Sequence, residues 1–276
     1  MSNIFDLSNK RAVITGGAGL LGRAHAISLL KIGANVDLWD LNFAKLEAVK
    51  SEIQDLFPNQ KIDIHKIDIT QEVEIESILA TSYSDKKSIE VLINNAAMNP
   101  TMKNDQKSDS KDSRLENYSI DSWNREIGVG LTGTFLCSKH VGTKMAKKGY
   151  GVILNIASDL SVIAPDQRIY LIDGLEKDSQ PVKPVTYSVI KSGLVGLTKY
   201  LATYWATSGI RANSLSPGGI FDNQPDQFVE KLTNLIPMGR MASPQDYFGA
   251  VQFLCSDASS YMTGQNLIID GGRSVW

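Results

Sequence analysis

The residues best suited to acid–base chemistry are Tyr187 and Lys191, the two ends of the run Tyr187-Ser-Val-Ile-Lys191. Their spacing places both side chains on one face of a helix. A free tyrosine has a pKa of about 10 and exchanges protons poorly at neutral pH. A neighbouring ammonium favours the phenolate, so we expect Lys191 to lower the pKa of Tyr187. The pair predicts proton transfer at an oxygen atom, but such a string is common by chance and its meaning depends on the surrounding elements.

Those elements alternate regularly. Short apolar runs predict strands at 12–15, 35–39, 62–67, 91–93, 151–157, 211–215 and 266–269, and amphipathic runs predict helices at 20–32, 44–56, 72–81, 123–148, 186–208 and 243–255. Such alternation indicates an α/β fold whose mostly parallel sheet is covered on both faces. We predict a Rossmann-type, doubly wound parallel sheet in a single domain spanning residues 1–276. Ligands of these sheets bind beyond the carboxyl ends of the strands.

The first strand end carries the glycine-rich run Thr15-Gly-Gly-Ala-Gly-Leu-Leu-Gly22, which opens a helix. In this context Gly16 would permit a tight turn, Gly19 would let the backbone approach a pyrophosphate, and Gly22 would let the helix pack closely on the strand. The N–H groups at the start of the helix would face the phosphates of a dinucleotide. The alternative is a purely structural turn.

The second strand ends in Asp40, 18 residues after Gly22. An acidic side chain at this place bonds the adenosine ribose hydroxyls and repels a 2′-phosphate. The next residue is Leu41 rather than a basic residue. We therefore expect NAD(H) to be preferred over NADP(H), the alternative being that Asp40 is only a solvated residue at a strand end.

Two further strand ends fit a cofactor site. The third strand runs into Asp68-Ile69 and the fourth into Asn94-Asn95-Ala96-Ala97. Small residues after a strand let the backbone contact a flat ligand, and an amide side chain ties neighbouring strands together. Their occurrence at successive strand ends supports the cofactor interpretation of the glycine turn.

The bulk composition excludes several classes of function. The 276 residues are 42% hydrophobic and 21% charged, with a net charge of −2 and a pI near 6.0. This balance offers no basic surface for nucleic acid or for an anionic membrane. No apolar run approaches the ~20 residues of a membrane span, and the N-terminus lacks a signal-peptide pattern.

The cysteines and histidines give no metal-binding pattern. Cys137 and Cys255 lie far apart, as expected of core residues in a reducing cytoplasm. His25, His65 and His140 are isolated in the sequence and are interpreted as structural or solvated. We predict no metal site and a cytoplasmic location.

Taken together, these motifs resemble the short-chain dehydrogenase/reductase family in its compact single-domain form. The likeness covers roughly Leu7 to Arg273. Besides the glycine turn and Tyr187/Lys191, it rests on Asp68, Asn94-Asn95-Ala96-Ala97, Asn155-Ile-Ala-Ser158, Ser216-Pro-Gly-Gly219, Thr263-Gly-Gln and Asp270-Gly-Gly272.

The resemblance implies a role for each catalytic residue. Tyr187 would be the general acid/base, Lys191 would bond the nicotinamide ribose and tune the tyrosine, and Ser158 would hydrogen-bond the substrate oxygen. Tyr170 is a rival tyrosine, but Gly174 occupies the position where its lysine would stand.

The resemblance also implies the cofactor contacts. Asn95 would lie near the cofactor ribose, Asp68 and Ile69 by the adenine, and the backbone of Ile220 at the carboxamide. The full predicted set is Gly16, Gly19, Leu20, Leu21, Gly22, Asp40, Asp68, Ile69, Asn95, Ala96, Tyr187, Lys191, Pro217, Gly218 and Ile220.

Two departures from the family pattern concern single positions. Compact members usually have a glycine where Leu20 stands, and the spacing here is more like that of longer sugar-nucleotide epimerases. The family's asparagine, which holds a water in the proton relay, aligns with Gly130. Asn124 is six residues away, about 240° around a helix, and does not replace it. We expect Gly130 to slow the relay or to leave room for substrate or water, and Gly130→Asn to preserve the fold and some activity.

The third departure is an insert at about 165–184. Ser158 and Tyr187 lie 29 residues apart, more than twice the usual separation. The charges of the insert nearly cancel, and both its ends adjoin predicted catalytic residues. We interpret it as a cover that faces the substrate, the alternative being a surface loop. A second polar insert, at about 99–119, is interpreted as flexible surface.

The leading hypothesis is an NAD(H)-dependent oxidoreductase that interconverts a secondary alcohol and a ketone on a small polar, sugar-like substrate. The segment from Gly218 to Arg240 and the insert at 165–184 resemble oxidoreductases of bacterial surface-sugar and flagellin-glycan synthesis, so carbohydrate biosynthesis is the expected setting. The alternatives are a 3-oxoacyl thioester reductase and a weakly active NAD(H)-binding sensor or scaffold. The resemblance further implies a homo-oligomer, a tetramer or a dimer, built through its two long helices.

Overall fold

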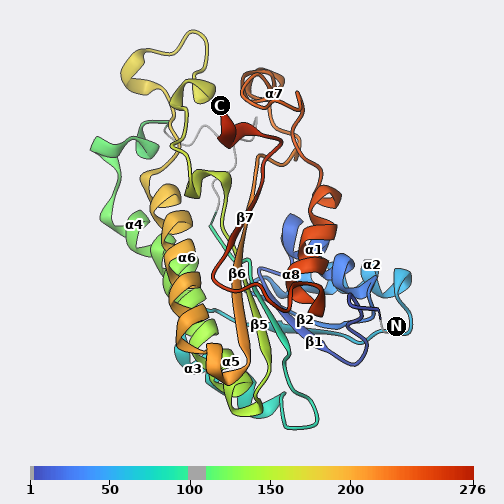
Figure 1. Ribbon diagram of the computed structural model, residues 1–276. Helices are drawn as coiled ribbons and strands as arrows, with labels where there is room; N and C mark the ends of the chain where they lie inside the picture. The colour runs from blue at the N-terminus through green and yellow to red at the C-terminus, as the bar shows by residue number, and fades with distance from the viewer. Residues whose placement is uncertain (1–2, 99–109) are drawn as a thin grey trace.

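The computed structural model describes residues 3–98 and 110–276 (Figure 1). Seven parallel strands form one sheet in the order β3-β2-β1-β4-β5-β6-β7. Their bounds are β1 Arg11–Thr15, β2 Asn35–Asp40, β3 Ile62–Lys66, β4 Val91–Asn94, β5 Gly151–Ile156, β6 Ile210–Pro217 and β7 Asn266–Ile269. The predicted single-domain, doubly wound α/β fold is confirmed. The chain reverses its direction of winding between β1 and β4, where ligands of such sheets bind.

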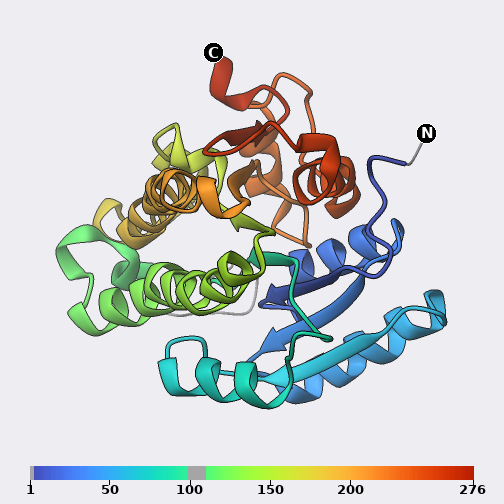
Figure 2. The same cartoon turned by 60° about the horizontal axis from the view of Figure 1, so that its bottom comes forward.

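Helices cover both faces of the sheet (Figures 1 and 2). Their bounds are α1 Leu20–Leu30, α2 Phe43–Leu56, α3 Glu72–Thr81, α4 Ile120–Ile127, α5 Thr134–Lys148, α6 Val185–Tyr204, α7 Asp226–Thr233 and α8 Phe248–Cys255. In the described ranges, none of these helices combines the length and the apolar character that a membrane crossing requires.

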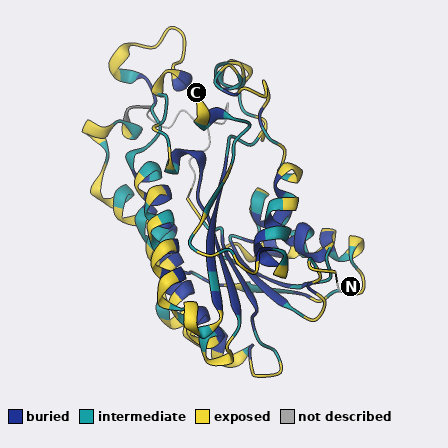
Figure 3. Ribbon diagram, viewed as in Figure 1, coloured by how far each residue is buried: buried dark blue, intermediate teal, exposed yellow. Residues whose placement is uncertain are grey.

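Alternation along the strands divides the core into two layers. Ala12 and Ile14 of β1 pack in a cluster with α1, α2 and α8, whereas Val13 packs in a cluster with α3, α5 and α6. Side chains of a strand point alternately to opposite faces, so a buried strand must be apolar on both. Figure 3 shows the result, a buried sheet between helices whose outer faces are exposed.

The helix predicted over 123–148 is interrupted. It divides into α4 and α5, joined by a π-helical segment at Gly128–Gly133. A Cβ at Gly133 would lie 2.7 Å from the side chain of Ile69, and one at Gly130 would lie 2.8 Å from Ile190. Glycines therefore let this segment approach its neighbours closely. Helical periodicity across the segment gave no sign of the irregularity.

The insert forms a packed layer with α7, a helix that the sequence did not predict. Ile169 and Tyr170 are buried against Leu232 and Ile236, and the rings of Tyr170 and Phe228 lie 5.5 Å apart. In Figure 1 the insert (yellow) and α7 (orange) both extend beyond the carboxyl ends of the strands. The insert therefore lies over the edge of the sheet where a ligand is expected. Of the polar segment 99–119, residues 99–109 lie outside the described residues, and residues 110–113 and 115–117 form 3-10 turns.

Candidate active site

The glycine turn between β1 and α1 requires its glycines. Gly16 has φ +64°, and a Cβ there would lie 2.8 Å from the Cα of Ala96. A Cβ at Gly22 would lie 2.1 Å from the carbonyl oxygen of Gly16. We had expected Gly22 to let the helix pack on the strand, but it brings the helix against the glycine turn instead. The sequence reasoning did not use Gly17, but a Cβ there would lie 2.7 Å from the Cβ of Leu38 in β2.

The start of α1 has the properties of a phosphate site. Gly19 is the N-cap and has no side chain to bond the first N–H groups, those of Leu20, Leu21 and Gly22. Such groups have no partner within the helix, and with the helix dipole they favour an anion. The glycine turn and these N–H groups, which we call the cradle, therefore fit the pyrophosphate of a dinucleotide.

Asp40 ties the end of β2 to the glycine turn. One carboxylate oxygen accepts the N–H of Ala18 at 3.1 Å, and the other accepts the N–H of Asn42 at 2.9 Å. The negative charge is thus fixed beside the phosphate cradle. This is more than the solvated strand-end residue of the alternative interpretation, and the position suits a ribose hydroxyl.

A hydroxyl and an amide close the other side of the turn. Thr15 Oγ1 accepts the N–H groups of Asn95 and Ala96, each at 3.0 Å. The Asn95 amide donates to the carbonyls of Thr15 (3.0 Å) and Gly16 (3.2 Å). Asn95 therefore ties β4 to β1, as predicted for an amide at this place, and Thr15 is a structural partner that the sequence reasoning missed.

The remaining predicted cofactor residues lie at neighbouring strand ends. The Asp68 carboxylate accepts the N–H and the hydroxyl of Thr70, and Ile69 is buried. Pro217 ends β6, and a Cβ at Gly218 would lie 2.7 Å from the Cα of Asp270. The Ile220 carbonyl accepts from Gln224 at 2.9 Å. All of these positions line the carboxyl edge of the sheet; their contacts with a cofactor stay predictions.

Tyr187 and Lys191 lie in the first two turns of α6 and face the same side. Lys191 is 6% exposed, and its Nζ lies 5.6 Å from the centre of the Tyr187 ring and donates to the Ile156 carbonyl at 2.9 Å. Lys183 of the insert lies closer, with its Nζ 3.7 Å from the ring centre. The tyrosine therefore has two ammonium groups beside it, one of which the sequence reasoning overlooked.

The expected lowering of the Tyr187 pKa is not what the structure shows. Burial raises the pKa of Tyr187, and a hydrogen bond with Ser158 opposes that rise. The same burial lowers the pKa of Lys191 to about 8, helped by repulsion from Lys183, whose own pKa burial also lowers to about 8. Desolvation disfavours every charged form. For Tyr187 it acts in the direction opposite to the one that the sequence argument expected.

Ser158 joins Tyr187 from the end of β5. It is buried, and besides its bond with Tyr187 its Oγ donates to Asp159 Oδ1 at 2.8 Å. Asp159 in turn pairs with Arg273 at 2.8 Å. Ser158 lies two residues after β5, at the start of a 3-10 turn, and helix α6 supplies Tyr187 and Lys191. The three predicted catalytic residues therefore come together although 29 residues separate the first two.

The space beside Gly130 is filled. A Cβ there would lie 2.8 Å and 3.0 Å from two methyl groups of Ile190, the residue before Lys191. Our expectation that Gly130 leaves room for substrate or water is therefore wrong, because an isoleucine from α6 occupies that room. Gly130→Asn requires Ile190 to move.

The insert is held in place by hydrogen bonds between its two ends, where the Lys183 N–H donates to Gln167 at 2.8 Å, and in its middle. Gln180 accepts the Ile172 N–H at 2.8 Å and donates back to the carbonyls of Ile172 and Leu175. Lys231 of α7 donates to the Leu171 carbonyl at 2.7 Å. Tyr170, the rival tyrosine, is packed inside this layer and burial raises its pKa. These bonds make the insert an ordered segment, and its role as a cover that faces the substrate stays a prediction.

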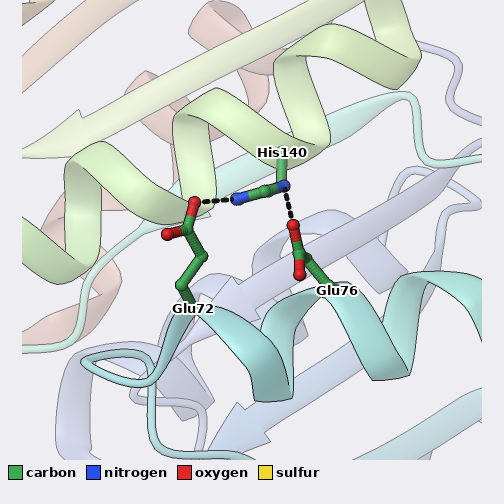
Figure 4. A group of neighbouring side chains, drawn as sticks. All are labelled: Glu72, Glu76 and His140. Atoms are coloured by element: carbon green, nitrogen blue, oxygen red, sulfur yellow. Dashed lines mark hydrogen bonds and ion pairs between the residues drawn. The ribbon is translucent and has the colours of Figure 1, made fainter.

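One group of titratable side chains lies away from this site, between α3 and α5 (Figure 4). His140 Nε2 lies 2.7 Å from Glu72, and Nδ1 lies 3.9 Å from Glu76. Lys139 contacts the same Glu72 oxygen at 2.6 Å. The two ring nitrogens of His140 thus face different carboxylates, and the Lys139 ammonium contacts one of these carboxylates as well. The four side chains are arranged as a cluster of ion pairs. Although His140 is isolated in the sequence, the fold brings these partners to it.

Comparison with known protein families identifies the family of this chain. A family profile described as short chain dehydrogenase matches residues 10–170, more than half of the chain. The chain belongs to the short-chain dehydrogenase/reductase family. A second profile, described as Enoyl-(Acyl carrier protein) reductase, matches residues 176–274. This short-chain dehydrogenase/reductase is therefore an oxidoreductase, and the resemblance inferred from its motifs is confirmed at the level of the family.

Relatives of this short-chain dehydrogenase/reductase include polyol and sugar-acid enzymes. It is 32% identical to an NAD-dependent glycerol dehydrogenase of Listeria innocua, over 98% of this chain and 96% of the relative. A short chain dehydrogenase of Leptospira borgpetersenii, solved with bound NAD+, is 32% identical with a TM-score of 0.81 and covers 100% of this chain and 97% of its own. A gluconate 5-dehydrogenase of Burkholderia cenocepacia, solved with NADP and tartrate, is 26% identical with a TM-score of 0.82 and covers 99% and 98%.

Proposed function

We propose that this protein uses NAD(H) to interconvert a secondary alcohol and a ketone on a small polar substrate of the polyol or sugar type. The observation that carries the proposal is the meeting of Ser158, Tyr187 and Lys191 at the carboxyl edge of the sheet, beside the cradle that ends at Asp40. The glycerol and gluconate dehydrogenases among the relatives support this substrate class. The narrower assignment to surface-glycan synthesis stays a sequence-based prediction.

The side chains divide the chemistry among them. A bound nicotinamide supplies or accepts the hydride. Tyr187 gives its hydroxyl proton to the substrate oxygen in reduction and takes a proton back in oxidation. Ser158 orients that oxygen, and the Lys191 ammonium favours the phenolate when Tyr187 is deprotonated. Because burial raises the pKa of Tyr187, oxidation is expected to be faster at alkaline pH.

A preference for NAD(H) follows from charge. Asp40 is fixed by two backbone N–H groups beside the cradle, where a 2′-phosphate would approach its carboxylate. The glycerol dehydrogenase relative is NAD-dependent, whereas the gluconate 5-dehydrogenase was solved with NADP, so the relatives do not decide the matter. The choice therefore rests on Asp40.

The decisive experiment is a screen of oxidation with NAD+ and with NADP+. Glycerol, threitol and gluconate are the first alcohols, and Tyr187→Phe is the matched variant because it removes only the hydroxyl. We expect NAD+-dependent turnover that falls at least about a hundredfold in Tyr187→Phe. Equal turnover in the two proteins would refute the assignment of Tyr187.

The acyl-reductase alternative has two observations in its favour: the profile match over residues 176–274, and 3-oxoacyl-[acyl-carrier-protein] reductases among the relatives. It predicts NADPH-dependent reduction of a 3-oxoacyl thioester, which the same screen includes as a substrate. The sensor alternative predicts NAD(H) binding without turnover of any alcohol or ketone. Gly130 gave this alternative some weight, and Ile190 fills the space beside it.

We also propose that the protein is a homo-oligomer that associates through α5 and α6. The outer faces of these helices carry exposed aromatic residues around a hollow of about 690 Å³: Phe135 is 49%, Tyr200 60% and Tyr204 62% exposed. An exposed apolar patch of this kind favours association. Light scattering of the wild type and of Tyr200→Glu tests it: we expect a dimer or tetramer that dissociates in the variant, and a monomeric wild type would refute the proposal.

A further inference from the structure

A buried ion pair lies behind the catalytic residues. Asp159 directly follows Ser158 and is 3% exposed, and Arg273, in the C-terminal segment after β7, is 8% exposed. Arg273 Nη1 lies 2.8 Å from Asp159 Oδ2. Because β5, β6 and β7 are neighbours in the sheet, residues 114 positions apart meet at one edge.

The second oxygen of Asp159 fixes the Ser158 hydroxyl. Asp159 Oδ1 accepts from Ser158 Oγ and from the Leu160 N–H, each at 2.8 Å. A hydroxyl has one proton and two acceptor positions. Since the proton of Ser158 goes to the carboxylate, its oxygen is left to accept from the Leu160 N–H at 3.2 Å.

The two charges of the pair oppose each other at Tyr187. Burial is the largest influence on the pKa of Tyr187 and Ser158 the next; after these, Asp159 raises the pKa and Arg273 lowers it. The two charges of an intact pair therefore act on the tyrosine in opposite directions, whereas either partner alone would act without that opposition through a poorly solvated site.

We propose that Asp159 and Arg273 are positioning residues of this active site, which hold the Ser158 hydroxyl in one direction and balance the charge that faces Tyr187. The proposal rests on the proposed role of Tyr187 as acid/base. Groups on other elements also face Tyr187, and they are unchanged in the variants below: Lys183 from the insert, Lys191 on α6 and Tyr170 in the layer with α7.

The test is a titration of the Tyr187 hydroxyl in the whole protein. Carbon-13 tyrosine NMR follows the ring carbon that bears the hydroxyl, and Tyr187→Phe assigns the signal. Asp159→Asn leaves Arg273 unopposed, so the midpoint should fall by about one pH unit. Arg273→Gln leaves Asp159 unopposed, so the midpoint should rise by about as much. Arg273→Lys keeps the charge and should restore the wild-type midpoint.

The matched control is another buried arginine–aspartate pair, Arg11 with Asp37, in β1 and β2. Arg11→Gln should lower the stability and leave the Tyr187 midpoint unchanged. Shifts of the same sign in Asp159→Asn and Arg273→Gln, no shift in either, or an equal shift in Arg11→Gln would overturn the proposal.

The titration needs no substrate, so it decides about the pair even if the alcohol screen finds no turnover. Where the screen does find a substrate, the pH dependence of kcat for oxidation should move in the same direction as the NMR midpoint in each variant. The KM for NAD+ should stay unchanged, because the pair contacts Ser158 rather than the cradle. A change in that KM without a change in the pH profile would contradict the positioning role.

Discussion

At the scale of the residue, the charge at Asp40 decides a testable preference. We predict that Asp40→Asn lowers the ratio of kcat/KM for NAD+ to that for NADP+ by about tenfold, because the amide keeps the shape but no longer repels a 2′-phosphate. The ratio is measured with the alcohol found in the screen. Asp68→Asn, at the neighbouring strand end, is the control and should leave the ratio unchanged. An unchanged ratio in Asp40→Asn would show that Asp40 has a structural role and does not select the cofactor.

A second residue-scale prediction concerns Gly130. Because a Cβ there meets Ile190 at 2.8 Å, Gly130→Asn should lower the free energy of unfolding by about 1–3 kcal/mol. Ile190→Ala in the same chain provides the missing space, so the double variant should lose less than the sum of the two single variants. Urea unfolding of the four proteins measures this coupling. Strict additivity would show that the two positions do not compete for space.

At the scale of the element, the insert at 165–184 leads to a prediction about substrate binding. Its middle, residues 173–178, is exposed, and its flanks are fixed by Gln180 and by α7. Replacing 173–178 by a short Gly-Ser linker should raise the KM for the alcohol several-fold and leave the affinity for NAD+ unchanged, because the insert covers the catalytic half and not the cradle. Isothermal titration with NAD+ and steady-state kinetics separate these effects. Equal losses in both would count against a substrate cover.

At the scale of the whole molecule, we expect the stability of the fold to decrease in acid because of one buried histidine on α1. His25, on α1, is 1% exposed; burial lowers its pKa to about 4, and a hydrogen bond with Asn95 opposes that shift. The unfolded chain binds a proton at this residue below a pKa near 6.5, which the folded chain does not bind until about pH 4. Stability from this group is therefore present above pH 6.5 and is lost as the pH falls from 6.5 to 4, by about 3 kcal/mol.

The prediction is checked by urea unfolding at pH 7 and pH 4.5. His25→Met keeps the apolar volume and removes the titration, so it should show a smaller loss between the two pH values than the wild type. Its stability at pH 7 is a separate matter, because the variant also gives up the bond to Asn95. Parallel losses in both proteins would assign the acid sensitivity to other groups.

The sequence determined the topology and the membership of the site. Apolar runs at 12–15 and 91–93, followed by glycine or small residues, predict a parallel sheet with a ligand edge, so the cradle was identifiable from spacing. The catalytic role of Ser158 came only from the resemblance to the family. Helix α7 was not predicted because it is short and its apolar residues pack against the insert, whose sequence has no repeating pattern. Periodicity reports local order and does not report such mutual packing.

What only the tertiary structure decided is the environment of each identified group. Sequence spacing placed Lys191 beside Tyr187 but gave no measure of their burial, which reverses the expected direction of the tyrosine pKa. It could not place Ile190 in the space at Gly130, nor bring Lys183 onto the tyrosine ring. Nor could it join Arg273 to the residue after Ser158. Desolvation and long-range contacts depend on which atoms surround a group in three dimensions, and the order of residues along the chain specifies these only through the completed fold.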